Sequence, residues 1–385
     1  MSDVPPAVTG RKVRAGRRVL PALGLCAAGA ALAAGLLAAP GAGCAADRRG
    51  LEARQNRVYP PAPQPPRVIA LGTLRGAPPP AEAQVKLAEF LFGAPPPPVL
   101  TLVDPLGLAA GEDLVLICDP VLSAVFRWER NGDSVIQEDF TPPLEAPYAC
   151  DLGPSGMRYV CDRQGVRRSD PGGRTLTTYA LPAGQPYRPG DVLEMGPQVW
   201  VTNLLQHRIE VFDAESGVWQ RSIGERGLGP GQLVLPRSLA RTPEGQACVV
   251  DVMNARVQVF GPDGQWLGQI GGQGDVVGRF GRPKDVAVGP DGTVFVTDAF
   301  SQRVHAFSAD GTPLLAFGEP GSGIGALTMP SGIAITKAVP RMGAALPPDA
   351  APLYYIWVGE KLDEPGVRLY AWVRSEGEGV DAPHA

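Results

Sequence analysis

The hydrophobic pattern of this chain consists of short apolar runs separated by turns rich in Gly, Pro, Asp and Asn. Runs such as VFVTD at 294–298 and RVHAF at 303–307 combine β-branched and aromatic residues, which favours strands over helices. Equivalent runs stand at 248–252 and 256–260. Each is bounded by Gly or Pro within a few residues, as strands joined by tight turns are. We therefore predict an all-β protein.

The runs repeat with a regular period. Each unit opens with a proline that leads into a short apolar run, and the opening prolines are Pro105, Pro147, Pro189, Pro236, Pro283 and Pro330. Their spacings are 42, 42, 47, 47 and 47 residues. A four-stranded propeller blade needs roughly 40–50 residues. Six units of this length predict a six-bladed β-propeller of four-stranded blades.

The linkers between the units repeat as well. Gly224, Gly271 and Gly318 stand 12 residues before the next opening proline, and a second set stands five before it: Gly231, Gly278 and Gly325. This pattern resembles the NHL repeat over most of residues 100–375. The units at 236 and 283 match best, those at 105 and 147 are degenerate, and the unit at 330 carries the insertion AVPRMGAALPPDAAP. The resemblance implies a six-bladed propeller whose loops bind proteins or other polymers.

The last unit supplies only three strand runs, at 331–335, 354–358 and 367–373. The segment RVIALGTL at 67–74 has the composition of the missing fourth strand. A strand from the N-terminal side that completes the last blade would close the ring and remove two exposed sheet edges. We therefore predict a propeller over 67–375, followed by a flexible tail at 376–385.

The first 43 residues have the features of a secretory signal peptide. Five basic residues precede an apolar run that ends near GAGCAAD. The small residues before Cys44 resemble the lipobox of bacterial lipoproteins, in which this cysteine is lipidated, although Gly41 stands where Leu is usual. Cleavage by an ordinary signal peptidase after Ala45 or Ala46 is the alternative. We expect an exported protein, lipid-anchored on the extracytoplasmic side of a membrane.

Two further segments precede the first blade. Residues 44–66 are rich in proline and predict a stiff, extended tether. Residues 80–92 place apolar side chains near helical spacing and predict a short amphipathic helix, which either packs on the ring or touches the membrane.

The net charge of the chain limits the classes of partner that we expect it to bind. The formal net charge is −4, and removal of residues 1–43 leaves 30 basic and 38 acidic residues, a net charge of −8. Binding to a nucleic-acid backbone requires clustered Lys and Arg, so nucleic acid is excluded as the expected partner. We expect a monomer that binds a protein or an extracellular polymer.

A polar pair recurs in the units, with an Asp or Asn five residues before an Arg. The pairs are Asp162 with Arg167, Asn203 with Arg208, Asp251 with Arg256, and Asp298 with Arg303. Asp119 holds the acidic position of the first unit, where Ala124 replaces the arginine. Such residues could form a charged ring at a channel mouth. A feature repeated in every blade more often stabilises the blade, so we predict structural pairs.

Catalytic and metal chemistry have little support in the sequence. The chain has three histidines, His207, His305 and His384, at positions that predict no shared metal site, and we expect no cofactor. No GxSxG motif is present. Cys150 and Cys161 flank a turn, and they either form a disulfide or remain buried thiols.

We therefore predict a non-catalytic binding or scaffold module. The alternative is an extracytoplasmic enzyme, of lyase or lactonase type, with its site in the central channel.

Overall fold

The computed structural model describes residues 58–60, 67–75, 101–130, 135–338, 346, 350–362 and 365–374. All of them belong to one compact unit, residues 43–385. The described residues form an all-β, six-bladed propeller, and their single helix is the 3-10 turn η1 (Val252–Asn254). Within these ranges there is no helix whose length and apolar character would suit a membrane span.

The six blades are antiparallel sheets whose strands run outward from the centre, in chain order in blades 1 to 5. Blades 1 to 3 are built from β3 (Gly107–Ala110), β4 (Leu114–Asp119), β5 (Ala124–Glu129) and β6 (Val135–Gln137); from β7 (Ala149–Leu152), β8 (Arg158–Asp162), β9 (Gly165–Ser169) and β10 (Thr175–Tyr179); and from β11 (Pro189–Met195), β12 (Gln198–Asn203), β13 (Arg208–Asp213) and β14 (Trp219–Ile223).

Blades 4 to 6 continue the order. They are built from β17 (Pro236–Arg241), β18 (Ala247–Asp251), β19 (Arg256–Phe260) and β20 (Trp266–Gly271); from β21 (Pro283–Val288), β22 (Val294–Asp298), β23 (Arg303–Phe307) and β24 (Pro313–Phe317); and from β25 (Pro330–Thr336), β26 (Pro352–Glu360), β27 (Gly366–Val373) and β2 (Val68–Leu74). The linker between blades 3 and 4 adds a short parallel pair, β15 (Glu225–Arg226) and β16 (Gln232–Leu233).

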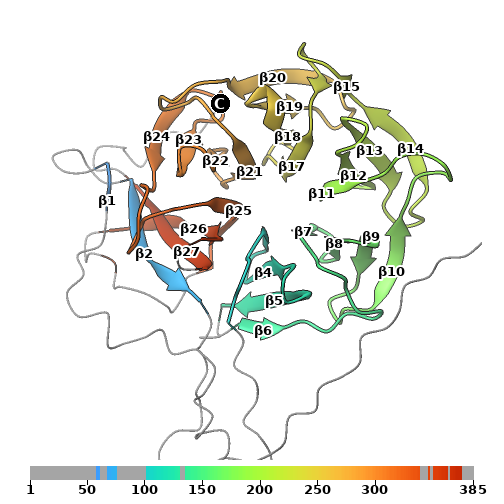
Figure 1. The fold of residues 1–385 in the computed structure, drawn as a ribbon, viewed down its shortest axis with the longest axis horizontal. Coiled ribbons are helices and arrows are strands. Elements are labelled where there is room, and N and C mark those ends of the chain that lie inside the picture. Colours follow the sequence, from blue (N-terminus) through green and yellow to red (C-terminus); the bar gives the residue numbers. More distant parts are fainter. Residues whose placement is uncertain are drawn as a thin grey trace, which may run out of the picture. The chain divides into compact units, whose positions relative to one another are not determined.

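The first strands of the blades form the inner wall of the ring. β3, β7, β11, β17, β21 and β25 each lie beside the next, and β25 returns to β3 (Figure 1). Both faces of a blade are covered by its neighbours, so the second strands are buried along nearly their whole length rather than on one face only. Every residue of β22 is buried, for example. Aromatic pairs fill the space between blades, with Trp128 and Trp357 4.8 Å apart and Phe295 and Trp372 5.0 Å apart between ring centroids.

The last blade receives its outer strand from the N-terminal side. β2 pairs antiparallel with β27, with Val68 opposite Trp372 and Leu74 opposite Val367. A fifth strand that the sequence did not predict, β1 (Val58–Tyr59), pairs with β2. The buried Tyr59 explains this addition, because its hydroxyl donates to the Gly325 carbonyl at 3.0 Å and its ring packs near Phe317.

Several predicted segments lie outside the described residues. These are the signal peptide at 1–43, most of the tether at 44–66, the helix at 80–92 and the tail at 376–385.

Candidate functional site

A cavity of about 210 Å³ lies at the centre of the ring, between the first strands of the six blades. Each opening proline of the repeat therefore leads into the channel wall, and residues at equal distances after the prolines form layers around the channel. The charged side chains of the lining are Asp151, Asp191, Arg237, Arg241, Lys284 and Asp285.

The second residue after the proline connects neighbouring blades. In blade 3, Asp191 Oδ2 accepts the backbone N–H of Leu239 in blade 4 at 2.8 Å. In blade 5, Asp285 Oδ2 accepts the N–H of Ile333 in blade 6, also at 2.8 Å. A buried N–H without a partner is costly, so each carboxylate stabilises the contact between two blades.

Smaller residues hold the same position in the other blades. Ser238 of blade 4 donates to Asp285 and lies 3.3 Å from the N–H of Val286, which reproduces the bridge with a hydroxyl. Blade 6 has Gly332, where a Cβ would lie 2.6 Å from the carbonyl oxygen of Leu106. Blades 6 and 1 thus touch through their backbones, and only glycine leaves room for this approach.

The surroundings of the channel carboxylates Asp191 and Asp285 disfavour their charged forms. Burial raises the pKa of Asp191 well above its ordinary value, and the nearby Asp285 raises it further. Burial also raises the pKa of Asp285. Neither residue stands out in the sequence as a candidate site residue. The signal was present, since both follow an opening proline by two positions, but only the ring places that position on the channel wall.

Basic side chains gather at the mouth where the first strands begin. Lys284 and Arg237 follow their opening prolines directly, and both are half-buried. Burial, together with charge repulsion from Arg237, Arg282 and Lys361, lowers the pKa of Lys284 to about 8. Lys361 is neutralised by Asp104, with Nζ and Oδ2 2.6 Å apart.

The opposite mouth has balanced charge. Arg241 donates to the backbone carbonyl of Glu194, and the Glu194 N–H donates to Asp151 Oδ2 at 2.9 Å. Burial raises the pKa of Asp151 to about 6, while the charge of Arg241 lowers it. Positive charge therefore dominates one mouth only.

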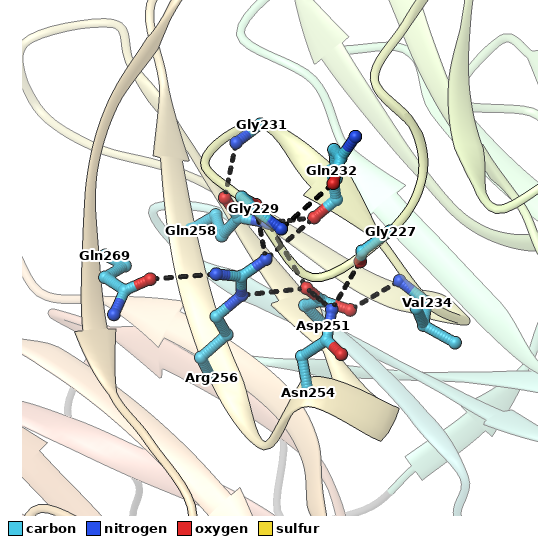
Figure 2. Close-up of polar contacts among 10 residues, drawn as sticks. All are labelled: Gly227, Gly229, Gly231, Gln232, Val234, Asp251, Asn254, Arg256, Gln258 and Gln269. Carbon is cyan, nitrogen blue, oxygen red and sulfur yellow. Dashed lines mark hydrogen bonds and ion pairs between the residues drawn. The ribbon is translucent and has the colours of Figure 1, made fainter.

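The recurring Asp and Asn residues stand at the ends of the second strands, where the chain turns into the third. Asp251 is buried: its Oδ1 accepts the N–H of Val234 at 2.7 Å, and its Oδ2 accepts from Asn254 at 2.7 Å and from Arg256 at 3.0 Å (Figure 2). Arg256 also donates to the carbonyls of Gly229 and Gln232. This cluster ties the turn of blade 4 to the linker that enters it.

The other units keep an Asp or Asn at this position, and the contacts of the arginine vary. Asp162 and Arg167 form an ion pair at 2.7 Å. Asn203 and Arg208 are joined indirectly, because both donate to Glu210. In blade 5, Asp298 accepts the N–H groups of Gly281, Arg282 and Phe300, and no ion pair with Arg303 is found among the described residues. Asp119, with no arginine partner in its unit, accepts four backbone N–H groups, those of Val103, Asp104, Val121 and Leu122.

A sixth member of this set was missed by the sequence analysis. Glu360 ends the second strand of blade 6 and accepts the N–H groups of Thr328 and Met329 at 2.8 and 2.9 Å. The insertion after β25 shifts its distance from the opening proline, and the longer Glu replaces Asp, so the spacing alone did not reveal it.

The disulfide suggested for Cys150 and Cys161 is not formed, and all four described cysteines are free. Cys150 lies opposite Val160 and Cys161 lies opposite Ala149. Because adjacent positions on a strand point to opposite faces of the sheet, the two thiols enter different hydrophobic clusters. Cys150 instead packs in the same hydrophobic cluster as Cys118 of blade 1.

The described histidines have separate surroundings. His207 Nδ1 accepts the N–H of Leu235 at 3.1 Å, and His305 Nδ1 accepts that of Gly278 at 3.3 Å. His384 lies outside the described residues. Over the described part of the chain, no group of three or more His, Cys, Asp or Glu is placed to hold a metal ion.

Exposed apolar side chains gather on the side of the ring where first strands begin and second strands end, which we call the linker face. In five blades the residue two positions after the Asp, Asn or Glu that ends the second strand is an exposed apolar residue on this face. Those from the turns are Val121, Leu122, Leu205, Met253, Phe300 and Leu362; those from the linkers are Val103, Leu228, Val276 and Val277. Phe300 is 70% exposed. Among the described turns of the opposite face, Val218 alone is a large exposed apolar residue, at 62%.

These features define a six-bladed β-propeller with a channel whose two mouths differ in charge. Its fold is similar to that of a gluconolactonase from Xanthomonas campestris, with 16% identity over 81% of this chain and 99% of that one and a TM-score of 0.51. A putative gluconolactonase matches with 13% identity over 83% and 99% of the two chains and a TM-score of 0.50. The calcium-binding protein regucalcin from Agrobacterium tumefaciens matches with 13% identity over 72% and 92%, also at 0.50.

These similarities show the fold and do not extend to the activity of this chain. No protein-family model matches the sequence, the NHL repeat included, and no curated protein matches it.

Proposed function

We propose that this protein is a non-catalytic binding module that docks a protein partner on its linker face. The observation that carries the proposal is the gathering of exposed apolar side chains on this face. Scattered exposed apolar residues are ordinary, whereas an apolar gathering rimmed by polar groups is typical of a protein-binding surface. Arg282, which is exposed on the same face, favours a partner with acidic groups beside its apolar ones.

The repeat explains how the ring presents these side chains. Ser123, His207, Ala255 and Gln302 have φ between 50° and 57° and stand directly before the third strand. Such a left-handed residue reverses the chain sharply, so the residues before it are held away from the sheet. The buried Asp or Asn at the start of the turn holds the turn in place through hydrogen bonds. Binding residues on turns held by a rigid scaffold suit a docking role.

Replacement of Phe300 by aspartate tests the docking face. Immobilised wild-type protein is incubated with detergent extracts of the source membranes, and captured proteins are compared with those captured by Phe300→Asp. We expect Phe300→Asp to capture at least tenfold less of the specific partner than the wild type does. The substitution replaces an aromatic side chain that would be buried in the interface with a charge that would have to lose its hydration. Val218→Asp is the matched control, since it places the same charge on an equally exposed apolar site of the opposite face. Equal capture by all three proteins would contradict the proposal.

We also propose that the protein is exported and held at a membrane through a lipid on Cys44. The support is the signal-like leader and the proline-rich segment after Cys44. We expect Cys44→Ser to move the protein from the membrane fraction to the soluble fraction, because stable anchoring needs more than one acyl chain and this cysteine would carry them. Fractionation with immunoblotting measures this. Unchanged membrane association would mean that another segment anchors the protein.

A second candidate function is an enzyme of lactonase or lyase type with its site in the channel. It is favoured by the channel carboxylates Asp191 and Asp285, because groups with raised pKa values in a cavity are frequent in active sites. Their backbone partners in the next blade favour the structural role instead. Hydrolysis of gluconolactone by the purified protein, lost in Asp285→Asn without loss of folding, would favour the enzyme.

A further inference from the structure

We propose that the basic mouth of the channel is a binding site for a small organic or inorganic oxyanion, held by Lys284 and Arg237. The site is separate from the apolar side chains of the linker face and does not depend on a docked protein. The ligand class is a small molecule with a carboxylate or phosphate group.

The first support is the absence of internal partners for these cations. Within the described residues, neither the Lys284 ammonium nor the Arg237 guanidinium donates a hydrogen bond to a protein acceptor or forms an ion pair. The repeat arginines Arg167 and Arg256, by contrast, are each held by a carboxylate and by carbonyls of the entering linker. The charge of Arg237 lowers the pKa of Asp285 in the next layer, but no hydrogen bond joins the two side chains in the described part of the chain. Half-buried cations without hydrogen-bond or ion-pair partners are unfavourable, so two of them side by side need an explanation.

The second support is the local charge. The positive charges of Arg282 and Lys361, like that of Arg237, lower the pKa of Lys284. Of these cations, only Lys361 forms an ion pair, with Asp104, among the described residues. The next layer of the channel holds Asp285 and Asp191, whose carboxylates accept backbone N–H groups. Burial raises the pKa values of both carboxyls, which reduces the negative charge that an anion would meet. An excess of positive charge therefore remains at this mouth, in a protein whose predicted mature form is acidic.

The third support is the size of the cavity. Its volume of about 210 Å³ is below the roughly 300–1,000 Å³ of sites for drug-sized ligands. It suits a ligand of a few heavy atoms besides the oxyanion. Arg237 can bind two oxygens of a carboxylate or phosphate with its fork of N–H groups, while Lys284 contributes a point charge.

The test uses inorganic phosphate and malonate as probes, with isothermal titration calorimetry on the purified protein at pH 7 and low ionic strength. We expect saturable binding of at least one probe to the wild type, and at least a tenfold weaker Kd in Lys284→Gln and in Arg237→Gln. Arg226→Gln is the control, because it removes an exposed cation of the same face away from the channel and should bind like the wild type. Binding of both probes would indicate a general oxyanion site, and binding of malonate alone a carboxylate site.

The pH dependence provides a second readout. The lowered pKa of Lys284 means that the lysine loses its proton as the pH rises through about 8. Wild-type affinity for malonate, whose own charge is constant over this range, should therefore fall between pH 7 and pH 9, with Arg237, Arg282 and Lys361 still charged. Lys284→Arg keeps its charge over this range and should bind equally well at both pH values.

Two results would overturn the proposal. One is no saturable binding of either probe to the wild type at tens of millimolar. The other is an equal loss in Arg226→Gln and Lys284→Gln, which would indicate only the general charge of the face. Circular dichroism and thermal unfolding check that each variant is folded. We expect Lys284→Gln to be no less stable than the wild type at pH 7, because it removes a charge whose folded form is unfavourable. The partner-capture experiment uses other residues, so the two proposals fail separately.

Discussion

Replacement of Ile69 by alanine is expected to lower the free energy of unfolding by about 2–5 kcal/mol, the usual cost of such a cavity in a core. Ile69 lies on β2, the strand that completes the last blade, and is only 1% exposed. Its side chain belongs to the cluster that includes Trp128 and Trp357 between blades 6 and 1. Loss of this contact weakens the one point where distant parts of the chain close the ring. Chemical denaturation followed by tryptophan fluorescence measures the change.

The matched control is Ile136→Ala. Ile136 lies on β6, the outermost strand of blade 1, and is 50% exposed. The same substitution on an equivalent outer strand should change stability by less than about 0.5 kcal/mol, because little apolar contact is lost. Deletion of residues 67–74 should have a still larger effect, since it exposes the edge of β27. If Ile69→Ala and Ile136→Ala were equally stable, β2 would not close the ring in solution.

Replacement of Asp251 by alanine is expected to cost about 3–5 kcal/mol, because it leaves the buried Arg256 without its carboxylate. Asn254, Gln258 and the N–H of Val234 also lose an acceptor. From the sequence, equal costs would be expected for Asp251 and Asp298, because their units match each other closely. Asp298→Ala should instead cost about 1–3 kcal/mol, the scale for backbone donors left without a partner, because it has no ion pair with its arginine.

A double variant separates the charge effect from the rest. Asp251→Ala with Arg256→Met removes both members of the pair and should recover part of the lost stability, since no buried charge remains unpaired. Asp298→Ala with Arg303→Met should recover none. Urea unfolding of the four variants gives the comparison. A binding defect confined to one of these blades, without loss of stability, would mean that its aspartate serves a ligand rather than the fold.

The fold could be predicted from the sequence because a propeller repeats the same local pattern six times. Pro236 and Pro283 each begin a first strand, and the runs after them become the expected second and third strands. A blade is a local antiparallel sheet with short turns, so its pairing is encoded within about 45 residues. The pattern weakened where the chain departs from the repeat. Glu360 was not recognised because an insertion changes its distance from the opening proline. The strand β1 was not predicted because it lies outside the repeated unit.

The candidate sites could not be predicted because they depend on which residues of different blades lie close together. A periodic sequence does not reveal these distances. Lys284 and Arg237 are 47 positions apart and equivalent in their units, so each looked like an ordinary polar residue at a strand start. Asp191 and Asp285 are likewise two equivalent positions whose mutual effect arises only when the ring closes. The opposite orientation of Cys150 and Cys161 followed from the register of β7 and β8.

The sequence by itself determined the all-β class, the number of blades and the position of the turn acids, because these follow from hydrophobic alternation and period along the chain. The tertiary structure decided what the channel contains, which turns share the apolar linker face, and which cations lack a partner. The physical reason is that charge and burial depend on distances across the ring. Those distances are set by the packing of six blades, and no single repeat contains them.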